Sequence, residues 1–205
     1  MPQAGIKYGA QIPGPDYDQI AEDAEKAVHK ALGVIRTEDL LSRRPEDLVK
    51  KTAEIIRQAD AQIAVHLTER DEALAHLRYY EPHRRLHRTA GLSPIGFRNA
   101  VARAVLGDQK ANLPDATSNE GLAQVAQELG VKRLDDARAQ LLEAAPIVAG
   151  AQNCREIAMR YMQQVILALS EPPYSWSPQE IADHAGMPRD TVYSIRRVAR
   201  KRRDS

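Results

Sequence analysis

The sequence predicts an all-α protein, a helical bundle, and three observations carry this prediction. Apolar residues make up 43% of the 205 residues but aromatic residues only 4%, so Ala and Leu must supply most of the core packing. Long stretches are rich in Ala, Glu, Arg, Gln and Leu, which favour helix intrinsically. Clusters of β-branched residues bounded by turn residues, which are typical of strands, are nearly absent. The length suits one compact domain or two small ones.

The first helix is expected to follow a flexible arm. Residues 1–15 are rich in Gly and Pro and predict this arm. Asp16 and Gln19 resemble a capping box, in which a side chain at each end of the first turn bonds a backbone N–H. Apolar residues then recur at helical spacing from Tyr17 to Ile35, which predicts an amphipathic helix.

A second, much longer helix is expected to dominate the region 16–106. Pro45 suits the first position of a helix, and neither Gly nor Pro interrupts the chain from there to about residue 78. Such a helix would span roughly 50 Å at 1.5 Å per residue. A helix this long usually packs on another long helix or on its copy in a second subunit. Residues 107–118, which contain Gly and Pro, then predict a linker before a helical domain at 119–205.

Three further helices are expected in this second half. The segment 117–120 (Thr-Ser-Asn-Glu) reads as a capping box, and Gly130 is a natural stop for the helix that it opens. The next helix is expected to end before Pro146, because proline removes a backbone donor inside a helix. A longer helix is predicted at about 152–170, closed by the prolines that follow it.

Charge is sorted along the chain into two basic islands. Residues 82–107 contain five arginines and no acid, and residues 172–205 contain seven basic and four acidic residues. The remaining two stretches are acidic, so the formal net charge of +1 conceals this pattern. Basic islands on an acidic body are expected of a protein that binds a polyanion. The alternative interpretation is that these arginines decorate solvated helix faces.

The later island contains the clearest motif, at residues 178–203. Ser177, Pro178 and Glu180 combine an N-cap, a first-turn proline and a reciprocal acid, which is a strong helix start. Gly186 is expected to end this helix after two turns. A second helix then begins, with three aliphatic residues expected to face inward: Val192, Ile195 and Val198. Two short helices joined by a glycine turn form a helix-turn-helix.

The spacing here resembles that of the bacterial helix-turn-helix family over about 20 residues. The matching positions are Ile181, Ala182, Gly186, Met187, Val192 and Ile195. The resemblance implies DNA binding, with the start of the second helix in the major groove. It implies base or near-base contacts from Arg189, Thr191, Tyr193 and Ser194, and phosphate contacts from Arg196, Arg197, Arg200, Lys201, Arg202 and Arg203. A generic helical hairpin could produce the same spacing.

A weaker copy of this pattern occurs at 83–103, in the earlier island. Its matching positions are Leu86, Gly91, Leu92, Phe97 and Ala100, but His87 replaces the expected Ala and Gly96 interrupts the supposed recognition helix. One interpretation is a second DNA-binding unit, and the other is a core helical hairpin with a basic rim. The candidate DNA-binding residues are Arg84, Arg88, Arg98, Asn99 and Arg103.

Enzymatic and metal-binding functions find little support in the sequence. Neither a phosphate-binding glycine loop, a nucleophile elbow nor an HExxH motif occurs, so an enzyme is not expected. His83 and His87 lie four residues apart, but the arginines around them suit phosphate better than a metal ion. Cys154 is the only cysteine, which fits a reducing cytosol. We expect no cofactor, no signal peptide and no membrane span, and a cytoplasmic, nucleoid-associated protein.

These features together predict a sequence-specific double-stranded DNA-binding protein of bacterial type. It would act as a transcriptional regulator or as a plasmid or phage maintenance factor, with the long helices forming a homodimer. The sequence identifies no small-molecule effector. One alternative is a protein-interaction module such as a sigma-factor partner, which the acidic N-terminal half supports. The other is a phage packaging-type oligomeric DNA-binding subunit.

Overall fold

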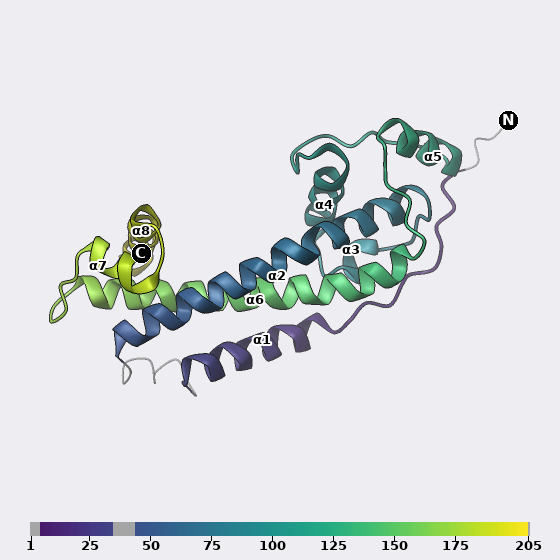
Figure 1. Ribbon diagram of the computed structural model, residues 1–205. Coiled ribbons are helices and arrows are strands. Elements are labelled where there is room, and N and C mark those ends of the chain that lie inside the picture. The colour runs from purple at the N-terminus through teal and green to yellow at the C-terminus, as the bar shows by residue number, and fades with distance from the viewer. Residues whose placement is uncertain (1–4, 35–43, 205) are drawn as a thin grey trace. The chain divides into compact units, whose positions relative to one another are not determined.

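The computed structural model describes residues 5–34 and 44–204 (Figure 1). Within them the chain is 71% helical and has no strand, so the predicted all-α class is confirmed. Among these helices, none has the length and apolar character needed to cross a lipid bilayer. The helices are α1 (Tyr17–Leu32), α2 (Pro45–Tyr79), α3 (Leu86–Thr89), α4 (Pro94–Leu106), α5 (Asn119–Glu128), α6 (Ala137–Ser170), α7 (Pro178–Ala185) and α8 (Arg189–Arg203).

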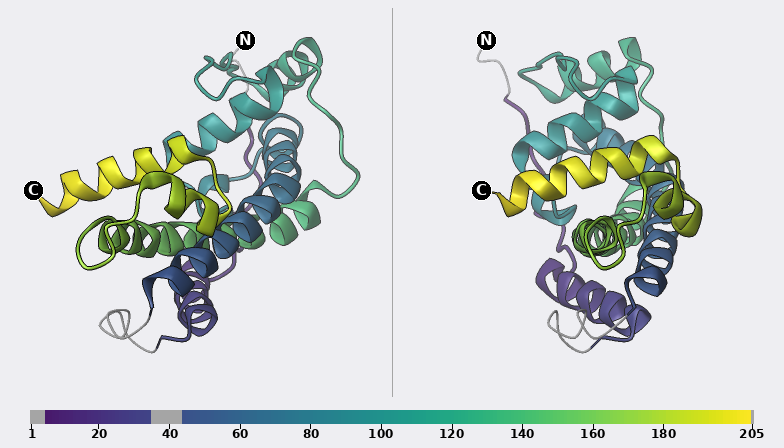
Figure 2. Two further views of the ribbon diagram at one scale, coloured as in Figure 1. Left: turned by 60° about the vertical axis from the view of Figure 1, so that its left-hand side comes forward. Right: turned by 90° about the vertical axis from the view of Figure 1, so that its left-hand side faces the viewer.

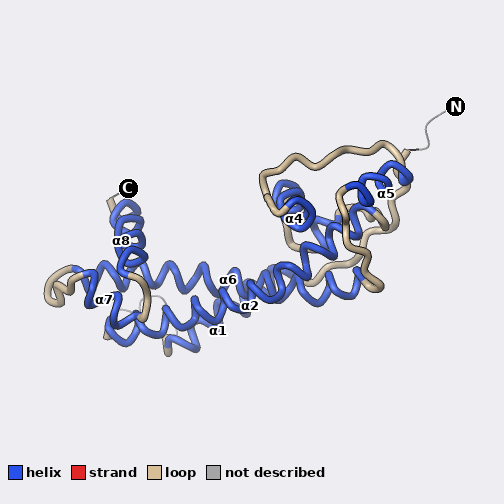
Figure 3. The backbone as a smooth tube through the Cα atoms, turned by 45° about the horizontal axis from the view of Figure 1, so that its top comes forward, coloured by secondary structure: helices blue, strands red, loops and turns tan. Residues whose placement is uncertain are grey.

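The chain forms two compact units, and each is assembled from two separate stretches of sequence. The first unit contains the residues up to Ile20 together with Ile63–Ala149. The second contains Ala21–Gln62 together with the residues from Gly150 onward. The long helices α2 and α6 therefore contribute one part to each unit. The predicted linker, residues 107–118, lies inside the first unit as the long loop between α4 and α5 (Figure 3).

The core of the first unit is formed by apolar residues of α2, α4, α5 and α6. Leu77, Val101 and Leu141 are fully buried there. The segment 5–15, for which the sequence predicts a flexible arm, has no helix but packs on this core through Ile12, which is 1% exposed. The carbonyl of Ile12 accepts a hydrogen bond from the hydroxyl of Thr89 at 2.7 Å. This segment therefore contributes directly to the packing of the first unit.

The core of the second unit joins α1, α2 and α6 to α7 and α8. Val28, Val49, Ile166, Ile181 and Val192 are all essentially inaccessible to solvent. They come from those five helices in that order, so each helix buries an aliphatic face in one common core. The apolar stripes seen in the sequence account for the buried face of each helix, since burial of such faces is the main source of helix stability in proteins.

The observed helix ends test the capping predictions. The carboxylate of Asp16 accepts hydrogen bonds from the backbone N–H groups of Asp18 and Gln19, both at 3.1 Å, so α1 begins where predicted. Ile35, the last residue of the predicted stripe, lies outside the described residues. Helix α2 (Pro45–Tyr79) matches the predicted helix from 45 to about 78.

Two predictions about helix ends are wrong. Ser118 rather than Thr117 caps α5, because its hydroxyl accepts a hydrogen bond from Gly121 N at 3.0 Å. Pro146 lies inside α6 and does not end a helix, so one 34-residue helix replaces the two that the sequence predicts. Ala145 and Val148 on either side of the proline are buried. We attribute the continuity of α6 to this packing, which offsets the hydrogen bond that proline cannot make.

Candidate nucleic-acid interface

The first part of the candidate site is helix α7, whose start is fixed by a complete capping box. The hydroxyl of Ser177 accepts from Glu180 N at 3.3 Å, and the carboxylate of Glu180 accepts from Ser177 N at 2.6 Å. The hydrogen bond from Ser177 N to the ionised carboxylate is the main reason that the pKa of Glu180 is lowered, and the Ser177 side chain adds to the effect. The prediction of a helix start at this point is confirmed.

A three-residue turn, 186–188, separates α7 from α8. Gly186 has φ 61° and ψ 44°, a left-handed conformation that glycine adopts without steric cost, and it ends α7 as predicted. The guanidinium of Arg57, on α2, donates a hydrogen bond to the carbonyl of Ala185 at 3.1 Å. This bond satisfies one of the carbonyls that a helix end leaves without a partner.

Helix α8 packs on α7 through one apolar face. Val192 and Ile195 are buried against Ile181 and Ala182 in the core, as the sequence predicts. The third inward residue is Ala199, 4% exposed, while Val198 is 41% exposed. The prediction for Val198 is therefore wrong. A straight α-helix brings the residue seven positions after Val192 back to the same face, and the residue six positions after it lies to one side.

The remaining face of α8 points to solvent and is rich in arginine. Figure 2 shows α8 extending well beyond α7 toward the C-terminal end of the chain. Every predicted contact residue on this helix is exposed except Arg196, which is half-buried. A shallow hollow of about 310 Å³ runs along this face and is lined by Tyr193, Ser194, Arg196, Arg197 and Arg200.

Tyr193 organises the first half of this face. Its ring lies 5.2 Å from the guanidinium carbons of both Arg189 and Arg196, within the range of cation–π attraction. Arg189 also donates a hydrogen bond to the Tyr193 hydroxyl at 3.0 Å, which is the main reason that its pKa is raised. In the part of the chain that the structure describes, no carboxylate forms an ion pair with Arg196, Arg197 or Arg200.

The last turn of α8 is engaged with α6. Arg202 donates a hydrogen bond to the side-chain carbonyl of Gln163 at 2.7 Å, and Arg203 forms an ion pair with Glu171. The bond to Glu171 is the main cause of the raised pKa of Arg203. These two arginines, which the sequence assigns to phosphate contacts, therefore already have partners within the second unit.

The weaker second motif, at 83–103, has a different local structure. Helix α3 has only four residues, half the length of α7, and Arg85 precedes it without a side-chain cap. Helix α4 starts at Pro94, where the Ser93 hydroxyl accepts from Gly96 N at 3.0 Å. The glycine turn is present, since Gly91 has φ +64°. Of the predicted contact residues, Asn99 is half-buried, and three are exposed: Arg84, Arg88 and Arg98.

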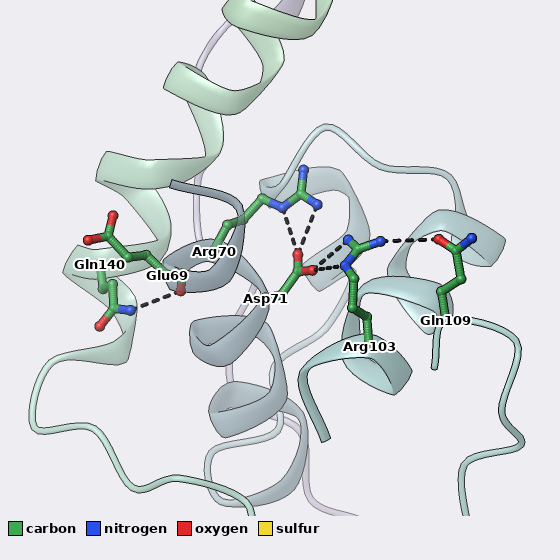
Figure 4. Close-up of polar contacts among 6 residues, drawn as sticks. All are labelled: Glu69, Arg70, Asp71, Arg103, Gln109 and Gln140. Carbon is green, nitrogen blue, oxygen red and sulfur yellow. Dashed lines mark hydrogen bonds and ion pairs between the residues drawn. The ribbon is translucent and has the colours of Figure 1, made fainter. Parts of the chain in front are cut away.

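Arg103, the fifth predicted residue of this motif, is held by an internal ion-pair network (Figure 4). Asp71, 3% exposed as a side chain, accepts from Arg103 Nε at 2.7 Å and from Arg70 at 2.8–3.0 Å. Arg103 also donates to the side chain of Gln109 at 3.2 Å. The guanidinium thus compensates a buried carboxylate of the first unit and does not extend into solvent as the other arginines do.

The burial of Asp71 was not predicted from the sequence, although a signal for it exists. Leu67 and Leu74 belong to the apolar stripe of α2, and Asp71 lies between them at four and three residues' distance. An acid on the apolar face of a helix must find a positive partner when it is buried. The pattern could therefore have predicted a buried ion pair, but not that Arg103 provides it.

Among the described residues, neither a metal-binding cluster nor an activated thiol is found. They contain no group of three or more His, Cys, Asp or Glu side chains arranged to hold a metal ion. Burial raises the pKa of the Cys154 thiol, whose sulfur lies 3.8 Å from the carbonyl oxygen of Ala24. This environment suits a packing residue better than a nucleophile, because only the thiolate is reactive.

Comparisons with protein-family models, with curated protein sequences and with solved structures found no match for this chain.

Proposed function

We propose that this protein binds double-stranded DNA in a sequence-specific manner through helix α8. The observation that carries the proposal is the solvent-facing surface of that helix. Arg196, Arg197 and Arg200 line one open hollow there, and within the described chain none of them has a carboxylate partner. Cations without ion-pair partners are the groups that DNA phosphates attract, because binding releases the counterions that surround the DNA.

The arrangement of α7, the glycine turn and α8 supports insertion of α8 into the major groove. The groove is about 12 Å wide and admits one α-helix. In helix-turn-helix proteins the N-terminal residues of the second helix contact base edges. Arg189, Thr191, Tyr193 and Ser194 occupy that part of α8 and are all exposed. Arg189 would exchange its hydrogen bond with Tyr193 for acceptors on a base.

Residues further along α8 would hold the phosphate backbone. Arg197 and Arg200 follow the base-reading segment by one to two turns, and Arg196 flanks it. If each of these three arginines neutralises one phosphate, a plot of the logarithm of the affinity against the logarithm of the salt concentration should have a slope of about −3 per subunit. A homodimer would double this slope and would place two α8 helices on half-sites about 34 Å apart.

The decisive experiment is retention of sheared genomic DNA by the purified protein, with excess competitor DNA at about 0.15 M salt, followed by sequencing. Enrichment of a few sites that share a motif would support sequence-specific binding, and an inverted repeat would support the dimer. Retention without enrichment would reject the regulator and favour a packaging-type or architectural role. No retention would reject DNA binding and leave the protein-partner alternative.

Matched variants separate base contacts from general charge. Ser194→Ala should relax the base preference at one position of the DNA motif. Arg197→Gln should weaken binding to all DNA sequences alike and reduce the salt dependence of the affinity by about one phosphate contact. The control is Arg155→Gln, an equal charge change on α6, where Arg155 is paired with Asp60 at 2.6 Å. If Arg155→Gln weakens binding as much as Arg197→Gln, α8 is not the interface.

A further inference from the structure

The first unit contains a pocket of about 280 Å³ whose wall includes two arginines. Four nitrogen-bearing side chains line it: Arg78, His83, Arg85 and His87. The carboxylate of Asp115 is the one acidic group among the lining residues. Leu86 and Phe97 provide an apolar side. A cleft with apolar walls and a few convergent polar groups is the usual form of a small-molecule site.

Arg78 is the most informative residue of this wall. It lies in the last turn of α2, and its Nε atom is buried with no hydrogen-bond partner in the described structure. Buried donors in folded proteins are nearly always satisfied, because an unpaired one costs the full desolvation of the group. Its guanidinium carbon lies 5.4 Å from the ring of Tyr79, and no carboxylate pairs with it in the described chain. This guanidinium is therefore suited to an anion that enters the pocket.

Arg85 reaches the same pocket through an unusual backbone conformation. Its φ of 56° and ψ of 34° lie in the left-handed region, which is uncommon for residues other than glycine. Strained backbone of this kind tends to occur at ligand-binding sites and persists where its surroundings hold it in place.

Contacts with the N-terminal segment fix the loop that precedes Arg85. Gly9 N donates to Pro82 O at 2.8 Å, and Arg84 N donates to Gly9 O at 3.3 Å. His83 Nδ1 lies 2.7 Å from the carbonyl oxygen of Ala10. The wall of the pocket is thus held in position before any ligand binds, which reduces the ordering cost of binding.

We propose that this pocket binds a small organic phosphate. The phosphoryl group would lie between Arg78 and Arg85, because planar guanidinium groups match phosphate oxygens in pairs. The apolar part of the ligand would pack on Leu86 and Phe97. A duplex is the less suitable source of the phosphate, because each of its phosphates is joined on both sides to a continuous strand that a pocket of about 280 Å³ cannot hold. This inference does not depend on the proposed role of α8.

The test is isothermal titration calorimetry with phenyl phosphate and with inorganic phosphate, at constant ionic strength. Both should bind to the wild-type protein, and phenyl phosphate should bind roughly ten-fold more tightly, because its ring removes apolar surface from water. Arg85→Gln should weaken both by about ten-fold or more, since a charge-assisted contact is lost. Arg78→Gln should have the same effect. Arg85 is exposed, so its variant keeps the test valid if Arg78→Gln does not fold.

Arg98→Gln is the matched control, because Arg98 is exposed on the neighbouring helix α4 and does not line the pocket. Its affinity for phenyl phosphate should equal that of the wild type. Three results would overturn the proposal: no binding of phenyl phosphate at millimolar concentration, equal weakening by Arg98→Gln, or displacement of phenyl phosphate by duplex DNA together with weaker DNA binding by Arg85→Gln. DNA retention through α8 is measured separately, so the two proposals can fail independently.

Discussion

The two helix pairs, α3–α4 and α7–α8, share a sequence pattern but differ in how their helices start. Helix α7 has a complete capping box between Ser177 and Glu180 and extends over eight residues. Helix α3 follows Arg85, whose side chain makes no capping hydrogen bond, and ends after four residues. The same spacing of aliphatic residues and glycine thus produces a two-turn helix in one place and a single turn in the other. The first-turn side chains, more than the apolar spacing, account for the difference.

The basic residues of the two pairs also have different environments. On α8, Arg197 and Arg200 project into solvent. On α4, Arg103 turns to the buried carboxylate of Asp71. An arginine count in a sequence window therefore overstates the charge that a surface offers to a polyanion. What decides the outcome is whether an acid lies within reach in the folded unit, and this cannot be read from neighbouring residues.

The largest effect should come from removing the buried acid. Asp71→Ala would leave Arg70, also buried, without its carboxylate, and should lower the free energy of unfolding by about 3–5 kcal/mol. Urea unfolding followed by circular dichroism measures this loss. The control is Asp60→Ala, which breaks an exposed ion pair with Arg155 and should cost at most about 1 kcal/mol. Equal losses would show that Asp71 has no special role.

The second-largest effect should be the difference in stability between alanine variants of the two turn glycines, Gly91 and Gly186. A Cβ at Gly91 would lie 2.5 Å from the Tyr17 ring, whereas one at Gly186 would have its nearest neighbour at 3.7 Å. Either substitution by Ala should lower the free energy of unfolding by about 1–2 kcal/mol, because a residue with a Cβ disfavours the left-handed backbone. Gly91→Ala should cost about 1–3 kcal/mol more because the ring must move. Thermal unfolding of the two variants gives the comparison, and a smaller loss for Gly91→Ala would contradict it.

The third effect concerns Tyr17, whose side chain joins α1 to α3 in the first unit. Its hydroxyl donates to Thr89 O at 2.8 Å, and burial raises its pKa from 10.0 to about 12, an effect that Arg70 partly opposes. The unfolded chain releases this proton above about pH 10 while the folded chain keeps it, so the contribution to stability should fall as the pH rises from about 10 to about 12.

Tyr17→Phe should therefore cost about 1 kcal/mol at neutral pH and should remove this part of the alkaline loss. Because Tyr17 is only partly buried, the alkaline contribution should be on the order of 1 kcal/mol after allowance for solvent screening. Urea midpoints at neutral and alkaline pH measure both effects. A variant with the same alkaline slope as the wild type would refute the assignment to Tyr17.

The smallest effect on stability should come from the solvent face of α8. Arg197→Gln removes a side chain that has no ion pair in the described chain and should change the free energy of unfolding by no more than about 0.5 kcal/mol. The same measurement on Ser177→Ala, which removes the cap of α7, should show a loss of about 1 kcal/mol. A destabilised Arg197→Gln would indicate a structural rather than a binding role for this arginine.

Local signals in the sequence predicted local structure well. The proline start of α2, the box at Ser177 and the glycine stop at Gly186 each act within one or two turns, and each is confirmed. The prediction for Pro146 was wrong because the packing of neighbouring residues kept α6 continuous. Of the candidate site, the exposed face of α8 could be predicted from helical spacing. The pairing of Arg103 with Asp71 could not, because it joins residues 32 positions apart.

The division of the chain into interleaved stretches bears on how the protein is made. The first unit has all its residues once Ala149 has been synthesised, whereas the second unit needs residues after Gly150 although part of it begins at Ala21. On the ribosome, α1 must therefore wait for most of the chain before the part of α6 that it contacts, at Cys154 and Tyr161, emerges. A cut at residues 107–118 would divide the first unit, and one after Ala149 would leave α1 and the start of α2 without most of their core. Neither piece left by a cut at 107–118 is therefore expected to fold by itself, whereas the piece that ends at Ala149 still contains the whole first unit.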